Sequence, residues 1–173
     1  MNPETSTARV ALKWGLITGL ALVVYSTILY TLELTTNTWL GILIYVFLAL
    51  GLVAGMLEYR TANGGYLGYG EGIGLGALLS AVAGLLSSAF SVFYTTIIDP
   101  NFQERLFEQM RDKLEEDGNM SDDQIDQMIE MSQKFQSPGL QFVFGLFFLI
   151  LIGVILSLLI AAFIRRNKAN PFE

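Results

Sequence analysis

Long apolar stretches alternate with short polar ones along this chain, and four of the apolar stretches contain no charged residue. The uncharged stretches are residues 14–32, 34–57, 72–98 and 135–164. Each of them reaches the roughly 20 residues that an α-helix needs to cross the hydrocarbon core of a bilayer. We therefore predict four transmembrane helices, with approximate limits at residues 12–34, 39–58, 70–98 and 138–164.

The long polar segment at residues 99–137 has the pattern of two amphipathic helices. In its first half an apolar residue recurs at every fourth position, which places these side chains on one helix face. They are Phe102, Leu106, Met110 and Leu114. Gly118 then supplies a stop signal, and Ser121 with Gln124 forms a capping box for a second helix. The apolar side of that helix carries Ile125, Met128, Ile129 and Phe135. The pattern predicts a helical hairpin outside the bilayer.

Small residues recur at every fourth position between residues 64 and 88. The ladder consists of Gly64, Gly68, Gly72, Gly76, Ser80, Gly84 and Ser88. In a membrane helix such a face lets a neighbouring backbone approach closely. The other three spans carry the same spacing, at Gly15 and Gly19, at Gly51 and Gly55, and at Gly153 and Ser157. We interpret these residues, with the ladder taken from Gly72 onward, as packing surfaces within one bundle; a homodimer contact is the alternative.

The composition supports this architecture and limits the chemistry. Hydrophobic residues make up 53% of the 173 residues, charged residues make up 15%, and the mean hydropathy is +0.51. We expect one all-α integral membrane domain over residues 1–173. Cysteine and histidine are absent, which excludes disulfides, thiol nucleophiles, imidazole bases and the usual zinc ligands. We therefore expect no cofactor, no metal centre and no enzyme activity.

The net charge of −6 is distributed unevenly. Residues 99–137 contain eleven acidic and four basic residues, a net of −7, whereas the rest of the chain has a net of +1. The turn at residues 117–123 has alternating oxygen ligands like a calcium loop, but Asp122 stands where such a loop has glycine and Met128 where it has glutamate. We interpret the segment as a solvated acidic hairpin, with a weak divalent-cation site as the alternative. Nucleic acid is excluded as a partner because the chain has no basic patch.

Lysine and arginine residues near the ends of the spans predict the orientation of the protein. They precede the first span, lie between the second and third, and follow the fourth, whereas the link between the first two has none. These residues are Arg9, Lys13, Arg60, Arg165, Arg166 and Lys168. Cytoplasmic loops carry an excess of such residues. We therefore expect both termini in the cytoplasm and the acidic hairpin on the other side of the membrane.

Glu71 is the ionisable residue with the strongest claim to a functional role. A carboxylate at the head of a glycine-lined membrane helix could take up a proton or a cation. However, Glu71 follows the interfacial Tyr66 closely and falls in the first turn of the predicted third helix. There the helix dipole favours an anion without any function. We interpret Glu71 as an interfacial residue and keep a speculative polar site as the alternative.

Four short motifs follow one another along the chain. They are Asn63-Gly64-Gly65-Tyr66, Ile98-Asp99-Pro100, Met120-Ser121-Asp122-Asp123-Gln124-Ile125 and Ser137-Pro138-Gly139. In this order they resemble an uncharacterised family of bacterial integral membrane proteins, family 4199 among the domains of unknown function. The resemblance implies a four-helix inner-membrane protein of a Gram-negative bacterium and supplies no activity. Relatives tend to have an amide near position 71, so the carboxylate of Glu71 departs from the family pattern and is not expected to be essential.

The chain lacks recognisable catalytic groups but has a structured, strongly charged element outside the bilayer. We expect a non-catalytic accessory, assembly or scaffolding component of the inner membrane that presents the acidic hairpin to a membrane or periplasmic protein. The alternative is a small oligomeric transporter or channel that uses the face of the third helix and Glu71. The lipid bilayer is the other expected partner, and homo-oligomerisation stays open.

Overall fold

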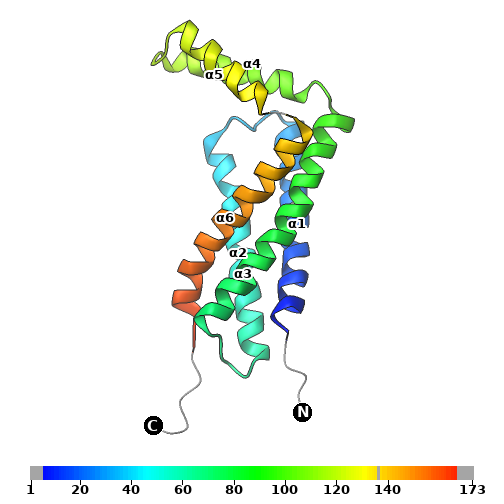
Figure 1. Ribbon diagram of the computed structural model, residues 1–173, viewed down its shortest axis with the longest axis vertical. Coiled ribbons are helices and arrows are strands. Elements are labelled where there is room, and N and C mark those ends of the chain that lie inside the picture. Colours follow the sequence, from blue (N-terminus) through cyan, green and yellow to red (C-terminus); the bar gives the residue numbers. More distant parts are fainter. Residues whose placement is uncertain (1–5, 136, 167–173) are drawn as a thin grey trace.

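The computed structural model describes residues 6–135 and 137–166 of the chain. These residues form six α-helices and one π-helix (Figure 1), namely α1 (Thr7–Thr31), α2 (Thr38–Ala62), α3 (Tyr69–Phe93), η1 (Tyr94–Ile98), α4 (Phe102–Asp117), α5 (Asp122–Lys134) and α6 (Pro138–Ile164). Four of them, α1, α2, α3 and α6, are long and apolar enough to cross a membrane. The predicted membrane bundle with a helical hairpin before its last span is confirmed.

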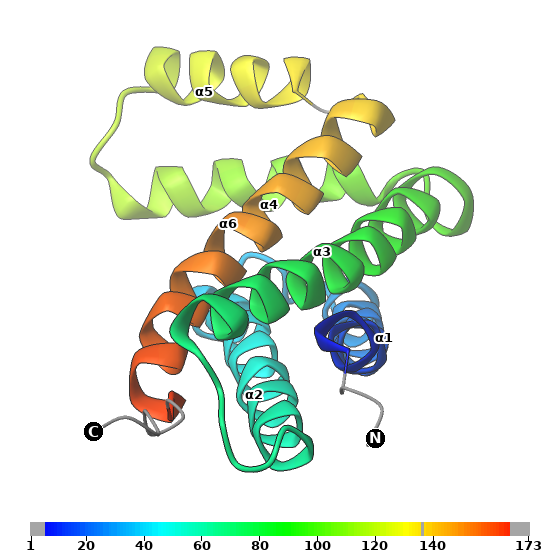
Figure 2. The ribbon, with the colours of Figure 1, turned by 60° about the horizontal axis from the view of Figure 1, so that its bottom comes forward.

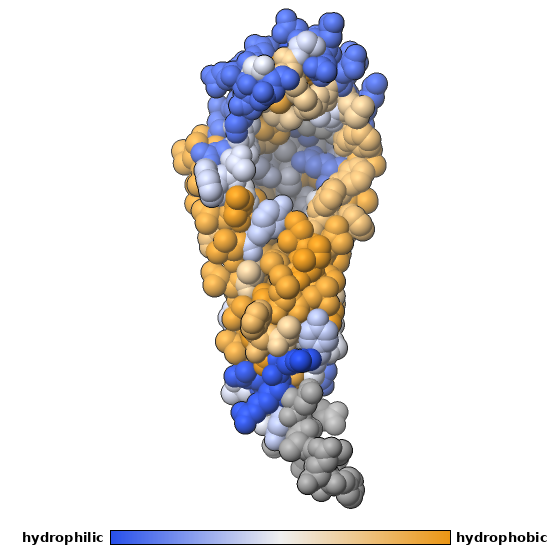
Figure 3. Space-filling model, turned by 90° about the vertical axis from the view of Figure 1, so that its left-hand side faces the viewer, coloured by the Kyte–Doolittle hydropathy of each residue, from blue (hydrophilic) through white to orange (hydrophobic). Residues whose placement is uncertain are grey.

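The four long helices form an elongated bundle, and α4 and α5 lie across one end of it (Figure 1). The start of α1 and the end of α6 lie at the opposite end. Helix α3 packs mainly against α1 and α6, and α2 contacts all three of the others. The buried centre is apolar, with Leu48, Leu52, Met56, Leu75 and Leu79 fully enclosed. Many other apolar side chains face outward, and Figure 3 shows them covering the surface below the hairpin, as expected where the solvent is lipid.

Helix α1 ends at Thr31, before the predicted limit at residue 34, because the chain turns in a Schellman motif. The N–H of Leu34 donates to the carbonyl of Leu29 (2.9 Å). The N–H of Glu33 donates to the carbonyl of Tyr30 (3.2 Å). Glu33 occupies the left-handed position of this motif with a φ of 55°, where glycine is the usual residue. A glutamate in this conformation needs compensating contacts, and the hairpin supplies them.

Helix α2 runs past the predicted limit at residue 58 and ends at Ala62. Residues 58–63 contain no glycine or proline, so the helix continues up to the turn. In that turn Gly64 and Gly65 adopt positive φ values of 68° and 88°. The additional helical turn carries Arg60, whose Nη1 donates to the carbonyl of Ile164 (3.2 Å). The turn between α2 and α3 is thereby tied to the end of the last span.

The predicted third span, residues 70–98, changes its helical register near its end. Residues Tyr94–Ile98 form a π-helix, and the N–H of Asp99 donates to the carbonyl of Tyr94 (2.8 Å), five residues back. The hydroxyl of Thr95 bonds to the carbonyl of Ser91 (3.1 Å), a type of contact that bends helices. Tyr94 and Thr95 are buried at this end of the bundle.

The two hairpin helices run antiparallel and side by side across the bundle (Figure 2). Gly118 ends α4 in the left-handed conformation, with a φ of 63°. At the start of α5, Oε1 of Gln124 accepts from the N–H of Ser121 (3.0 Å), as the capping-box pattern predicts. Local sequence signals therefore fix both ends of the turn.

The contact between α4 and α5 combines apolar burial with one ion pair. Ile125 and Ile129 of α5 are buried. Arg111 of α4 pairs with Asp126 of α5. Phe135, predicted on the same apolar side, lies just beyond the end of α5 and is exposed, because the helix ends at Lys134.

Candidate functional site beneath the hairpin

Small residues on α3 face small residues on α6 along much of the bundle. The facing pairs are Gly72 with Ala161, Gly76 with Ser157, Ser80 with Gly153, and Ser88 with Gly145. A Cβ added at Gly76 would lie 2.6 Å from the Cβ of Ser157, closer than Cβ atoms pack in proteins. Gly84 similarly faces Leu146 of α6. The small-residue face of α3 is therefore covered by a helix of the same chain.

The glycines singled out on α1 and α2 also lie against side chains of the bundle. Gly15 faces Val82, Gly19 faces Ala83 and Leu86, Gly51 faces Thr18, and Gly55 faces Leu79. Close contact of this kind is a main source of helix association in lipid. All of these contacts lie within one chain, so they need no second copy.

Glu71 lies in the first turn of α3 and is exposed. Its Oε2 accepts from the N–H of Gly68 (2.8 Å), which satisfies a free donor at the start of the helix. Its Oε1 accepts from the hydroxyl of Tyr59 (3.4 Å). At the same end of the bundle, Lys13 pairs with Glu58 (2.7 Å). Glu58 and Glu71, the described carboxylates at this end of the bundle, thus have structural partners.

The hairpin is fastened to the bundle through its basic residues. Nε of Arg105 donates to Glu33 (2.8 Å), and another guanidinium nitrogen pairs with Asp99. The hydrogen bond and the charge of Arg105 hold the pKa of Asp99 below its usual range. Nζ of Lys113 donates to the carbonyl of Thr36 (2.6 Å). The strained Glu33 is therefore a bridge between the α1–α2 loop and the hairpin.

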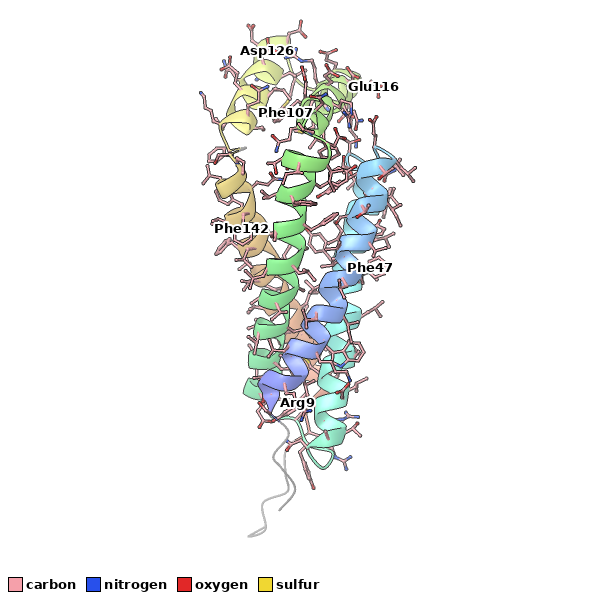
Figure 4. All side chains as sticks on the ribbon, turned by 90° about the vertical axis from the view of Figure 1, so that its right-hand side faces the viewer. Arg9, Phe47, Phe107, Glu116, Asp126 and Phe142 are labelled. Carbon is pink, nitrogen blue, oxygen red and sulfur yellow. The ribbon has the colours of Figure 1, made fainter. Side chains whose placement is uncertain are left out.

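The outer face of α4 carries a stripe of exposed acidic residues, which we call the acidic stripe. It consists of Glu104, Glu108, Asp112 and Glu116. The stripe is offset by two residues from the apolar one, so the two lie on opposite sides of the helix. Among the described residues none of the four has an ion-pair partner. Figure 4 shows Glu116 at the end of the molecule far from Arg9. Like charges at this spacing destabilise a helix by about 0.2–0.5 kcal/mol per pair.

A cluster of hydrogen-bonded polar side chains lies beneath the hairpin, with Gln141 of α6 at its centre. Nε2 of Gln141 donates to the hydroxyl of Ser91 (3.1 Å), which is also 3.1 Å from the hydroxyl of Tyr30. Oε1 of Gln141 accepts from the hydroxyl of Thr95 (3.3 Å) and from Nε2 of Gln103 (3.2 Å). This polar cluster joins α1, α3, η1, α4 and α6.

The polar cluster was not predicted from the sequence, although one signal for it was present. Gln141 and Ser157 are the only side chains with polar atoms between Pro138 and Ile164. A lone amide in so apolar a helix indicates a polar partner inside the bundle. The sequence does not say which helix supplies that partner, because serines and threonines occur in several spans.

The polar cluster lines a cavity of about 530 Å³ between the hairpin and the bundle. The hairpin supplies an apolar wall and two charged residues, and the bundle supplies uncharged polar groups. The wall consists of Phe102, Leu106, Met110, Leu114 and Met128, the charged residues are Lys113 and Asp117, and the polar groups belong to Tyr30, Thr35, Thr36, Thr95 and Gln141. A second cavity of about 220 Å³ reaches into the bundle and shares Tyr30 and Gln141 with the first. Figure 3 shows a hollow beneath the hydrophilic hairpin on this side of the molecule.

The chemistry of the polar cluster is that of binding by uncharged groups. The side chains of the polar cluster are hydroxyls and amides, which donate and accept hydrogen bonds without changing charge near neutral pH. In residues 6–135 and 137–166 no group of three or more acidic residues lies close enough together to hold a metal ion. The site is therefore suited to holding a polar group within apolar walls.

A family model described as "Protein of unknown function (DUF4199)" matches residues 13–166. No curated protein and no solved structure matches the chain. The matched range begins within α1 and ends just after α6, so it includes the hairpin and the other three spans. The chain therefore belongs to the DUF4199 family, a family of proteins of unknown function, as its motifs predict.

Proposed function

We propose that this protein is a non-catalytic accessory, assembly or scaffolding component of a bacterial inner membrane that holds the acidic stripe out to a partner protein. The separation of charge within the hairpin carries the proposal. Arg105 and Lys113 reach back to the bundle and Arg111 reaches α5. The acidic stripe is exposed, and its four carboxylates have no ion-pair partner in the part of the chain that the structure describes.

The fold of the chain does not require an acidic stripe without ion-pair partners. It weakens α4 by like-charge repulsion, and no ion pair among the described residues offsets this. The ion pairs of Arg105 keep the hairpin attached to the bundle, so the stripe is displayed on an ordered platform. Such a surface favours a partner with lysine and arginine residues, whose approach it would accelerate at low salt.

The same charge distribution supports an orientation with both termini in the cytoplasm. Arg9, Lys13, Arg60, Arg165 and Arg166 belong to the end of the bundle opposite the hairpin; Lys168 lies outside the described residues. An Asp117→Cys variant should react with a membrane-impermeant maleimide added from the non-cytoplasmic side. Reaction from the cytoplasmic side alone would contradict this orientation.

The partner proposal is tested by photo-crosslinking in native membranes from Asp112, in the middle of the acidic stripe. We expect a discrete adduct whose yield falls as salt is raised, since exposed charges are screened. A neutral-stripe variant carries Glu104→Gln, Glu108→Gln and Glu116→Gln. A control variant loses the same charge elsewhere on the hairpin, through Asp117→Asn, Asp123→Asn and Glu130→Gln.

Comparison of the two variants shows whether the crosslink depends on the acidic stripe itself or on the overall negative charge of the hairpin. The neutral-stripe variant should lose the adduct and the control variant should keep it. Equal yields from both variants, or no adduct from position 112, would refute the proposal. No described observation favours the transport alternative, because α6 covers the small-residue face of α3 and Glu71 caps that helix at an exposed position.

A further inference from the structure

We propose that the larger cavity beneath the hairpin binds the head of a membrane amphiphile that is uncharged and carries carbonyl oxygens, such as a diacylglycerol or a quinone. This site is separate from the acidic stripe and goes beyond the proposed accessory role. Its volume of about 530 Å³ falls within the roughly 300–1,000 Å³ of small-molecule pockets. Its lining has the usual make-up of such pockets, an apolar wall with a few convergent polar groups.

The hydrogen bonds of the polar cluster leave donors available and few acceptors. Gln141 Oε1 accepts from Gln103, and the hydroxyl of Thr95, whose single hydrogen is also within reach of the carbonyl of Ser91, lies 3.3 Å from the same oxygen. One hydrogen of Gln141 Nε2 goes to Ser91, and the described residues offer no acceptor for the other. The two hydroxyls of Tyr30 and Ser91 share one hydrogen bond, so one of their two hydrogens is also uncommitted. A ligand that completes this arrangement must bring acceptor oxygens.

The charges around the cavity favour an uncharged head. Of the residues that line it, Lys113 is the only cation, and its Nζ already donates to the carbonyl of Thr36. Asp117 is the only anion in the lining. An anionic head placed among Tyr30, Thr95 and Gln141 would meet both the cation of Lys113 and the anion of Asp117, so the lining offers it no net counter-charge. The surplus acidity of the hairpin would further repel it.

The position of the cavity fits a ligand that comes from the membrane. Figure 3 shows the hollow where the hydrophobic surface of the bundle meets the hydrophilic hairpin. An amphiphile held there can place its head on the polar cluster while its tail stays among lipid or follows the apolar underside of α4. Leu106, Met110 and Leu114 form that underside.

Equilibrium binding to the full chain in phosphatidylcholine nanodiscs tests the proposal, with empty nanodiscs as the background. The probes are radiolabelled dioctanoylglycerol, decylubiquinone and palmitate. We expect saturable binding of about one molecule per chain for a neutral probe, and none for palmitate. The diacylglycerol and quinone arms distinguish the two sources of carbonyl oxygen. Binding of palmitate alone, or of no probe, would overturn the proposal.

Two kinds of variant test whether the probe binds in this cavity. Met110 lines the cavity and is not part of the polar cluster, so Met110→Trp should reduce the space and abolish binding. Met131→Trp adds the same ring at an exposed position of α5 and should not. Gln141→Leu removes the central donor and should weaken binding about tenfold. Wild-type binding by Met110→Trp would refute the site. If this variant fails to fold, wild-type affinity in Gln141→Leu refutes the assignment of the head to the polar cluster.

Discussion

The close approach of α3 and α6 at Gly76 makes Gly76→Ala a sharp test of the packing between these two helices. The added Cβ would lie 2.6 Å from the Cβ of Ser157. Both Cβ atoms are attached directly to helix backbones, so relief requires a helix to shift. Overpacking of this kind destabilises by about 1–3 kcal/mol.

A matched glycine separates this steric effect from helix propensity. Replacing a helical glycine by alanine favours the helix by about 0.8–1 kcal/mol. Gly74 is two residues away on the same helix, and a Cβ added there would have no neighbour within 4 Å. Gly74→Ala should therefore be neutral or stabilising. Relative to it, Gly76→Ala should lower the free energy of unfolding by about 1–3 kcal/mol.

A compensating substitution shows whether Ser157 is the cause. Ser157→Gly removes the opposing atoms but also loses the hydrogen bond from its hydroxyl to the carbonyl of Gly153 (2.6 Å), so alone it should destabilise. In the Gly76→Ala background it should be much less harmful, with a favourable coupling of about 0.5–3 kcal/mol.

The assay is equilibrium unfolding by SDS in mixed micelles, followed by circular dichroism, for the wild type, the three single variants and the double variant. The double-mutant cycle gives the coupling directly. If Gly76→Ala is as stable as Gly74→Ala, or if the coupling is zero, the α3–α6 contact is not packed as described.

Three further predictions concern the same two regions. Ser80 buries a hydroxyl that has no partner among the described residues, so Ser80→Ala should leave the free energy of unfolding unchanged or raise it by up to about 1–3 kcal/mol in the same assay; a loss would contradict the assignment. Glu33→Gly and Glu33→Ala both remove the link to Arg105, but glycine accepts the positive φ, so the glycine variant should be the more stable by about 1 kcal/mol. Because the pKa of Asp99 is lowered in the folded protein, its contribution to hairpin attachment is present above the usual carboxylate range and lost as the pH falls through the lowered pKa. Amide exchange in α4, corrected for its intrinsic pH dependence, should rise on acidification in the wild type and change less in Asp99→Asn.

The sequence by itself determined the number of spans, the presence of the hairpin and the small-residue faces. Spans follow from the length of uncharged apolar runs, because a bilayer of fixed thickness sets a minimum length. The turn at Gly118 and the cap at Ser121 are local signals that act over a few residues, so they can be recognised without a tertiary structure. Residues 64–88 likewise indicated one central packing helix, although the spacing alone left its neighbour undecided.

Only the tertiary structure decided which surfaces meet and what lies between them. Glu33 reads as a helix-end residue in the sequence, yet it bridges to Arg105 across a long separation in the chain. Gln141 reads as an isolated amide, yet it joins the helices that surround the cavity. The physical reason is that such contacts depend on the rotation and height of each helix in the bundle. Those quantities are fixed by packing all of the helices together, and no local pattern contains them.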